Sequence, residues 1–551
     1  MKKNSLTTAI LAGVAGVAGL ASVAHAVNLN PDGLGQVLIY PYYTVNGGNS
    51  TVITVVNTTN SVKAVKVRFV EAINSAEVYD FNLYLSPYDV WATNVVADGD
   101  TGAKLITVDK SCTVPNVLPG SFLPYAYQSS DVGRFFWNGA TQASRVRQGH
   151  LEVIEMGVVT EAAVVDDGTG TGRTTTLKLA ATHVQGVPRN CALLEAAWVD
   201  GGAWVDSRNY GVTPPEGGLF GSATIISGEY GRTLSYNADA IDGFYRTTGS
   251  ATLHYNPGTV SPNLAEARTS NTEAEARIFS NGDYYRIKYR PGNIDAVSAV
   301  FTSRYIYNEY NVNQGLAAAS EWVVTFPTKR YHARNTAQPY HTGSVGFLPF
   351  PNAFPIAFDE STSDFVSPGA CHSYAFNYWD REERTVQRQL TVSPPAPGPA
   401  AFRLCWEANV VAFGQTINAT TPTKILGATS TQGASGLSGF EFPEGWARIH
   451  MGGASIDNPS YYLPRAITVS AGDVANQVLI GQPVTGFWAS EVVNNNVEAG
   501  VRANYGVIHK HRASRDCFIH EPATGTLSSH PNGYGAGSAV PTTTATRCPA
   551  L

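Results

Sequence analysis

Apolar and polar residues alternate along many segments of this chain. In one of them Val65, Val67 and Phe69 alternate with Lys66 and Arg68. A period of two residues is that of a β-strand, whose successive side chains point to opposite faces of a sheet. We therefore expect strands with one buried and one solvated face, and we expect Lys66 and Arg68 to contact water. Further segments of this kind lie at 149–159, 321–330, 404–414 and 446–453.

Helical periodicity is rare by comparison. The best candidate begins at Asn293, where Ala296, Val300 and Tyr307 fall on one helical face. The turn residues at 57–61, Asn-Thr-Thr-Asn-Ser, separate two β-rich runs and predict a hairpin. The fold class that follows is mainly β, with two or more antiparallel β-sandwich (Ig-like) domains and small helical insertions.

The length of 551 residues predicts more than one domain, since single hydrophobic cores stop growing beyond roughly 250–300 residues. Proline, glycine and polar residues cluster at 211–218 and 333–343 and indicate linkers there. We expect an N-terminal β-sandwich domain at 27–212 and a β-rich middle region with short helices at 213–335. A C-terminal β-sandwich domain with a flexible C-terminal tail is expected at 336–551.

The first 26 residues have the three parts of a secretory signal peptide. Lys2 and Lys3 are followed by a small-residue apolar stretch at 9–23 and by Ala-His-Ala, which ends at Ala26. Residues 1–26 are therefore predicted to be a cleaved signal peptide. No later stretch is apolar for the ~18 residues that a spanning helix needs, so we expect no transmembrane segment after cleavage. The predicted location is extracellular, at the cell surface or in the periplasm.

The six cysteines point to disulfide bonds. An even number of cysteines in an exported chain is typical of a disulfide framework, and short loops cost least entropy to close. The spacings also lack the close Cys pairs of zinc ribbons. Sequential pairing is therefore predicted: Cys112 with Cys191, Cys371 with Cys405, and Cys517 with Cys548.

Charge argues against a nucleic-acid partner. Charged residues are only 15% of the chain, and the net charge is −6. Binding to phosphates requires clustered lysine and arginine side chains, and the sequence has no such cluster.

Four segments together resemble a known family. They are GHLEVIEMG at 149–157, GGLFGSATII at 217–226, EWVVTFPTKR at 321–330 and PVTGFWASEVVNN at 483–495. In this order they look like an uncharacterised family of exported, β-rich proteins of Gram-negative bacteria with no assigned activity. The resemblance implies one recurring architecture over most of the chain. It brings no catalytic residue and no cofactor.

Two candidate metal sites are weak. His509 and His511 would share one face of a strand, and two imidazoles can bind a transition metal. The neighbouring Lys510 and Arg512 would repel a metal ion, so no metal ligand is predicted. The acidic segment 98–109 departs from the EF-hand pattern and predicts a polar hairpin turn, with a structural calcium ion as the only cofactor considered.

No catalytic residue is predicted either. Glycoside hydrolysis needs two carboxyl groups roughly 5–10 Å apart across a cleft. Glu152 and Glu155 fall on opposite faces of their strand, and Glu407, beside Trp406, has no partner that the sequence can name.

We therefore expect a secreted or cell-surface structural or interaction protein that acts by binding or self-assembly. Its partners would be copies of itself or cell-surface glycans. The alternative is a secreted carbohydrate-active enzyme or glycan-binding protein. The sequence leaves open whether the protein is an enzyme, and the lack of a catalytic motif favours binding over catalysis.

Overall fold

A computed structural model gives the structure of the chain. It describes residues 26–73, 75–117, 120–123, 144–246, 251–270, 274–280, 282–289, 293–332, 349–350, 358–359, 364–365, 371–385, 402–454, 462–464, 477–498 and 501–519. Strands make up 52% and helices 11% of the structure. The predicted fold class, mainly β with several antiparallel sheets and short helices, is confirmed.

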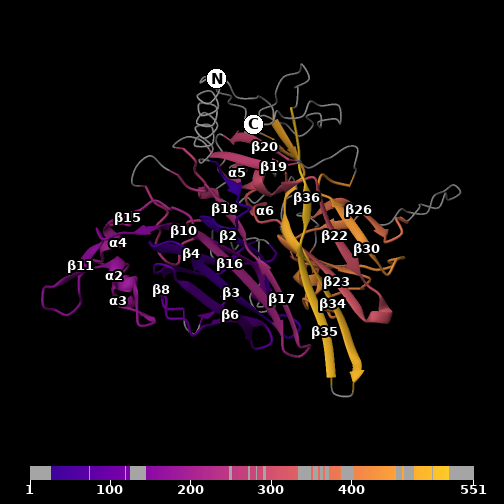
Figure 1. Ribbon diagram of the computed structural model, residues 1–551, viewed down its shortest axis with the longest axis horizontal. Coiled ribbons are helices and arrows are strands. Elements are labelled where there is room, and N and C mark those ends of the chain that lie inside the picture. Colours follow the sequence, from indigo (N-terminus) through magenta and orange to yellow (C-terminus); the bar gives the residue numbers. More distant parts are fainter. Residues whose placement is uncertain are drawn as a thin grey trace, which may run out of the picture.

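The first half of the chain forms a large β-sandwich (Figure 1). One sheet has the strand order β1-β18-β2-β10-β4-β5-β8, with β15 beside β10. The other has the order β17-β16-β3-β6-β7-β9. The strands of the first sheet are β1 Asn28–Leu29, β18 Asp239–Asp242, β2 Val37–Thr44, β10 Gln148–Val159, β4 Val62–Glu71, β5 Glu77–Leu85, β8 Cys112–Val114 and β15 Val212–Thr213. Those of the second are β17 Arg232–Asn237, β16 Leu219–Ser227, β3 Asn49–Asn57, β6 Val90–Asp98, β7 Gly102–Ile106 and β9 Gly120–Ser121.

The hairpin predicted around 57–61 is wrong. Strands β3 and β4 flank this turn, but they belong to opposite sheets of the sandwich. Both point apolar side chains, such as Ile53 and Val65, into the same core. Asn57 holds the crossing in place, because its side-chain amide donates to the carbonyls of Ser61 and Ser86, each at 2.8 Å.

The solvated face predicted for β4 is also wrong, since Lys66 and Arg68 are almost fully buried. The far face of the larger sheet carries a second hydrophobic core, which includes Ile39 and Met156. Helices and a small hairpin contribute to this core: α2 Leu177–Ala181, α3 Cys191–Ala196, α4 Ala203–Asp206, α5 Asn293–Phe301, β19 Ala274–Ser280 and β20 Asp283–Tyr289. The larger sheet is therefore the middle layer of the structure. The charged residues that alternate along β4 form buried ion pairs and are not solvated.

The helix predicted from Asn293 is present as α5, but it ends at Phe301. Tyr307, expected on its face, lies in a strand of the second β-sandwich. That sandwich has one sheet of order β27-β26-β30-β22-β36 and another of order β29-β28-β23-β34-β35. Its strands are β27 Phe402–Leu404, β26 His372–Asp380, β30 Glu444–His450, β22 Tyr305–Asn311, β36 Arg512–Ser514, β29 Ala434–Leu437, β28 Ala408–Phe413, β23 Ala318–Thr325, β34 Thr485–Glu498 and β35 Val501–Lys510.

Short elements complete the described part of the chain. They are β11 Val164–Asp166, β12 Thr174–Thr176, β13 His183–Val184, β14 Val187–Pro188, β21 Thr302–Ser303, β33 Gln482–Pro483, β24 Phe358–Asp359, β25 Asp364–Phe365, β31 Tyr462–Pro464, β32 Gln477–Ile480, β37 Asp516–Ile519, α6 Lys329–His332, and the 3₁₀ turns η4 Leu264–Glu266, η5 Gln314–Leu316 and η6 Ser430–Gln432. Among the described residues, no helix combines the length and the apolar character needed to cross a bilayer.

The two sandwiches share one hydrophobic core. The cluster around Leu38 and Phe69 in the first sandwich continues through Val323 and Phe487 in the second. Backbone contacts reinforce this junction, because the amide of Ala408 donates to the carbonyl of Ala72 at 2.9 Å. Strand β17 of the first sandwich and strand β35 of the second lie side by side at this junction (Figure 1).

Two glycines approach each other closely across this junction. Gly47 and Gly427 have φ values of +57° and +72°. A Cβ atom at position 427 would lie 2.5 Å from the amide nitrogen of Gly47. Only glycine fits here, since both the backbone conformation and the lack of space exclude a side chain.

Disulfides join Cys112 to Cys191 and Cys371 to Cys405, the pairings that sequence proximity predicts. The third predicted pair includes Cys548, which lies outside the described residues, as do the predicted signal peptide up to residue 25 and the C-terminal tail.

The described chain begins inside the protein. Val27 is fully buried, its amide donates to the carbonyl of Glu275 at 2.7 Å, and its carbonyl accepts from Arg277 at 2.9 Å. Ala26 is only 3% exposed. Its carbonyl oxygen would lie 2.3 Å from a Cβ atom at Gly243.

Candidate binding site between the two sandwiches

The two histidines considered as metal ligands have separate partners. His509 stacks on Trp488, with ring centroids 5.5 Å apart. His511 is partly buried. Its Nε2 lies 2.9 Å from the carbonyl oxygen of Val323 and its Nδ1 lies 3.1 Å from the amide of Asn308. Burial lowers the pKa of His511 to about 4, so the ring is neutral at neutral pH. No group of three or more metal-ligating side chains occurs among the described residues.

The acidic segment 98–109 forms the polar hairpin that its sequence predicts, between β6 and β7. Two of its carboxylates, Asp98 and Asp109, accept hydrogen bonds from the protein itself. Asp98 accepts from Lys104 at 3.0 Å and from Ser121 at 2.8 Å. Asp109 accepts from the amide of Ser111 at 2.8 Å. These carboxylates therefore stabilise the turn.

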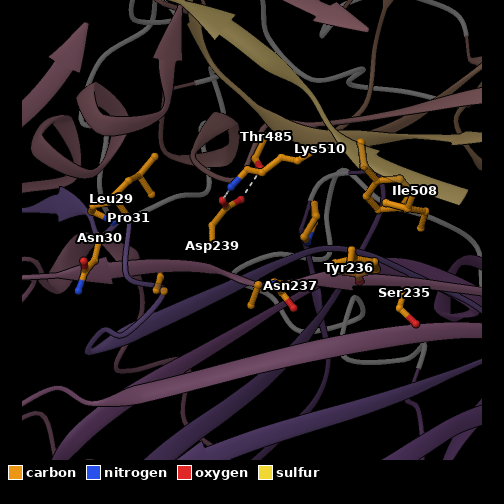
Figure 2. A pocket seen from close by; sticks show the side chains of 16 residues that line it. Leu29, Asn30, Pro31, Ser235, Tyr236, Asn237, Asp239, Thr485, Ile508 and Lys510 are labelled. Atoms are coloured by element: carbon orange, nitrogen blue, oxygen red, sulfur yellow. Dashed lines mark hydrogen bonds and ion pairs between the residues drawn. The ribbon is translucent and has the colours of Figure 1, made fainter. Parts of the chain in front are cut away.

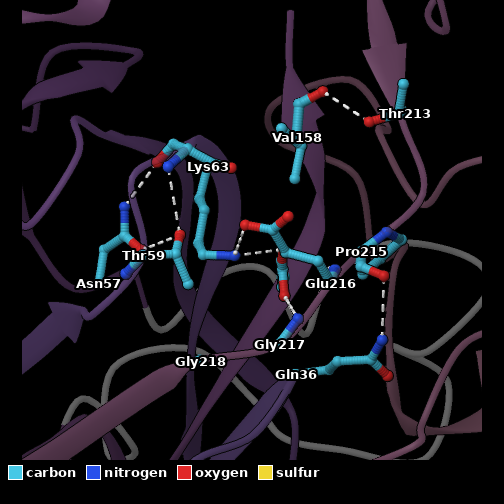
Figure 3. Close-up of polar contacts among 12 residues, drawn as sticks. Gln36, Asn57, Thr59, Lys63, Val158, Thr213, Pro215, Glu216, Gly217 and Gly218 are labelled. Carbon is cyan, nitrogen blue, oxygen red and sulfur yellow. Dashed lines mark hydrogen bonds and ion pairs between the residues drawn. The ribbon is translucent and has the colours of Figure 1, made fainter.

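Glu152 and Glu155 lie on opposite faces of β10, as predicted, and each has its own cation. Glu152 pairs with Arg68. Glu155 lies 2.8 Å from the Lys63 ammonium, and both side chains are fully buried. Lys63 also pairs with Glu216 at 3.1 Å, and Figure 3 draws both side chains. Buried charges require such pairing, so both glutamates are part of the folded framework.

Glu407 has a hydroxyl partner, and the carboxyl group of Glu71 is close enough to act on it electrostatically. It is fully buried and accepts a short hydrogen bond from Ser75. Burial raises its pKa to about 8. The nearby Lys329 donates to the carbonyl of Cys405 at 2.7 Å, and burial lowers its pKa to about 7. Glu407 is therefore a buried carboxyl group held in place by Ser75.

A different place in the structure has the character of a ligand site. A cavity of about 530 Å³ lies between the two sandwiches. It is lined by β17, β18 and residues 29–33 on one side, and by β34 and β35 on the other (Figure 2). Ligand sites of proteins are commonly cavities of this size between domains.

An ion pair occupies one side of the cavity. Asp239 of β18 is only 3% exposed and accepts a short hydrogen bond from the hydroxyl of Thr485. Lys510 extends from β35 across the cavity and pairs with the other carboxylate oxygen. Figure 2 shows both side chains reaching the same carboxylate. The Lys510 side chain remains 59% exposed, so solvent reaches the cation while the anion is enclosed.

The opposite wall is apolar with a polar border. Tyr236 and Phe487 stack with ring centroids 4.9 Å apart, and Ile508 lies beside them in the cavity lining. The Tyr236 hydroxyl donates to the backbone of Tyr42, so the ring is held in one orientation. Polar side chains at the border are Asn30, Ser235 and Asn237. An apolar wall with a few oriented polar groups gives a site both affinity and specificity.

Sequence reasoning missed this site because its groups come from three distant parts of the chain. Asp239 and Lys510 carry no local motif, and only the packing of the two sandwiches brings them together. Comparison with known protein families, curated proteins and solved structures finds no match.

Proposed function

We propose that the protein is exported and acts outside the cytoplasm as a binding protein that holds a small ligand between its two sandwiches. The observation that carries this proposal is the cavity with an ion pair on one side and stacked rings on the other. Two disulfides support a location in an oxidising compartment. Binding suits the site better than catalysis, because Asp239 and Lys510 neutralise each other.

The cavity favours a zwitterionic ligand with an apolar body. An ammonium group of such a ligand would pair with Asp239, and its carboxylate would pair with Lys510. The internal ion pair would thus be exchanged for two new ones, and no charge would be left buried without a partner. The apolar body would cover Tyr236, Phe487 and Ile508. Free amino acids and short peptides with large apolar side chains have this chemistry.

A filled cavity provides the test. We would titrate the full chain with phenylalanine, leucine and their dipeptides by calorimetry, and compare Ile508→Trp with Val507→Trp. Ile508 lines the cavity, whereas Val507 is 43% exposed on the same strand. Binding should be lost in Ile508→Trp and kept in Val507→Trp. If no probe binds, or if both variants bind equally, the proposal is wrong.

A further inference from the structure

The outer face of the second sandwich carries a cluster of aromatic and arginine side chains. It is formed by β26, β30, β22 and β36, at the side of the molecule away from the first sandwich (Figure 1). Strand register places Tyr307, Arg448 and Asn377 in one row across three strands. Trp446 and Trp379 stand opposite each other in the next row. We name the set Tyr305, Tyr307, Trp379, Trp446 and Arg448 the aromatic–arginine face.

Ring contacts run continuously along this face. The two tryptophans stack with centroids 4.1 Å apart. Trp446 is next to Tyr307 at 6.5 Å, and Tyr307 is next to Tyr305 at 5.9 Å. Trp446 is 39% exposed. Burial of such large rings would stabilise the fold more than exposure does, so half-exposed rings on a sheet face indicate a binding surface.

Arg448 lies between the rings. Its guanidinium carbon is 5.1 Å from the Tyr305 centroid and 5.2 Å from that of Trp379. Its Nε donates to the side-chain oxygen of Asn377 at 3.1 Å. The two terminal nitrogens have no hydrogen bond to another described residue. They form a fork, fixed by two rings and an amide, of the shape that binds a carboxylate with two hydrogen bonds.

The charge of this face is opposite to that of the whole chain. Arg403 and Arg512 extend from the same face, and neither has a carboxylate partner within the described part of the chain. The described strands of this face carry two carboxylates. Glu444 pairs with Arg381 at 3.0 Å, which leaves Glu309. Three arginines against one unpaired carboxylate make the face cationic, whereas the chain has a net charge of −6.

We infer that this face binds an acidic polysaccharide, a chain of sugar rings that carry carboxylate groups. The polarised C–H bonds of a sugar ring interact favourably with the π face of an aromatic ring, and the sugar carboxylate would pair with Arg448. A protein partner fits less well. The outward residues of the described strands include no leucine, isoleucine, valine or methionine that could fill a pocket on a partner. The inference is independent of the cavity, which lies elsewhere in the molecule.

Affinity electrophoresis of the full chain in alginate, polygalacturonate, dextran and poly-glutamate tests the inference. Binding to the two acidic polysaccharides is expected, with weakening at high salt because exposed charges are screened. Arg448→Gln and Trp446→Ala should each raise Kd about tenfold. Arg512→Gln, which changes an exposed side chain, should weaken binding without affecting the fold.

Matched controls are Arg189→Gln and Tyr88→Ala, both exposed in the first half of the chain, and they should bind like the unchanged protein. Ile508→Trp should also keep polysaccharide binding, which separates this face from the cavity. Equal binding to dextran or to poly-glutamate would overturn the inference, as would binding that survives both Arg448→Gln and Trp446→Ala.

Discussion

At the scale of single residues, buried lysines distinguish this protein. Lys63 is fully buried beside Glu155, and its removal would leave that carboxylate without its cation. We expect Lys63→Met to reduce the free energy of unfolding by about 3–5 kcal/mol, as for other broken buried pairs. Lys104→Met is the matched control, because Lys104 pairs with Asp98 at the surface. Its cost should stay below about 1 kcal/mol. Equal losses in urea denaturation would contradict this prediction.

His254 makes stability depend on pH. Its Nδ1 lies 2.7 Å from the carbonyl of Arg208, and so carries the proton, while its Nε2 accepts from the Tyr84 hydroxyl at 3.0 Å. Burial lowers the pKa of His254 from 6.5 to about 4. Below pH 6.5 the His254 side chain therefore binds a proton in the unfolded chain, whereas in the folded protein it stays neutral until about pH 4.

The contribution of His254 is thus complete above pH 6.5 and is lost as the pH falls toward 4. Between pH 7 and pH 4.5, the difference in unfolding free energy between the unchanged protein and His254→Asn should shrink by about 2–3 kcal/mol. Urea denaturation at the two pH values measures this. A difference between the two proteins that does not change with pH would show that the ring has the same pKa in the folded and unfolded states.

At the scale of single residues, some features could be predicted from the sequence and others could not. The opposite placement of Glu152 and Glu155 followed from strand alternation alone. The burial of Lys66 did not, because a lysine on a strand looks the same whether water or another layer covers it. Its partner, Asp80, lies on the adjacent strand β5, and only the tertiary structure gives that register.

At the scale of elements, the loop that contains Gly427 fixes one sandwich against the other. Gly427→Ala would introduce a left-handed alanine and a clash with Gly47. We expect a loss of more than about 2 kcal/mol in unfolding free energy. Gly439→Ala has a similar φ, +77°, but open space around it, so its cost should be about 1 kcal/mol. If both substitutions cost the same, the contact between the glycines contributes nothing.

The disulfide between β8 and α3 stabilises the helical layer on the larger sheet. Cys112 and Cys191 are separated by 79 residues. Chain entropy then gives a loss of roughly 4 kcal/mol for the double change to serine. The same change at Cys371 and Cys405, separated by 34 residues, should cost roughly 0.7 kcal/mol less. Thermal unfolding ranks the two variants, and the reverse order would contradict the prediction.

Strand content was predictable at this scale, but strand pairing was not. The alternating segments became strands because alternation reflects burial on a pleated surface. The turn at 57–61 has the composition of a hairpin turn, and yet it crosses between sheets. Local turn chemistry fixes a change of direction, whereas the partner of each strand depends on residues far along the chain.

At the scale of the whole molecule, the continuous core predicts one cooperative unit. Residues of both sandwiches form the same hydrophobic cluster, and backbone hydrogen bonds such as that from Ala408 to Ala72 cross between them. Calorimetry should therefore show one transition, with equal calorimetric and van't Hoff enthalpies. Two separate transitions would show that the sandwiches unfold independently.

The candidate site belongs to this scale too, which is why sequence could not reveal it. Single-chain patterns find ligands that are neighbours on a strand or helix. The cavity instead depends on the angle between two sandwiches, and neither Asp239 nor Lys510 is unusual on its own.

The burial of Ala26 and Val27, just before β1, limits when the predicted signal peptide could be removed. The bond between Ala26 and Val27, where the leader is predicted to be cut, is enclosed by Glu275, Arg277 and Gly243. A peptidase needs an extended, accessible chain around the bond it cleaves, and the native structure offers none there. If residues 1–26 are removed as the sequence predicts, their removal would then have to come before folding. In that case a molecule that folded first would keep the segment, because the native state shields the bond between Ala26 and Val27.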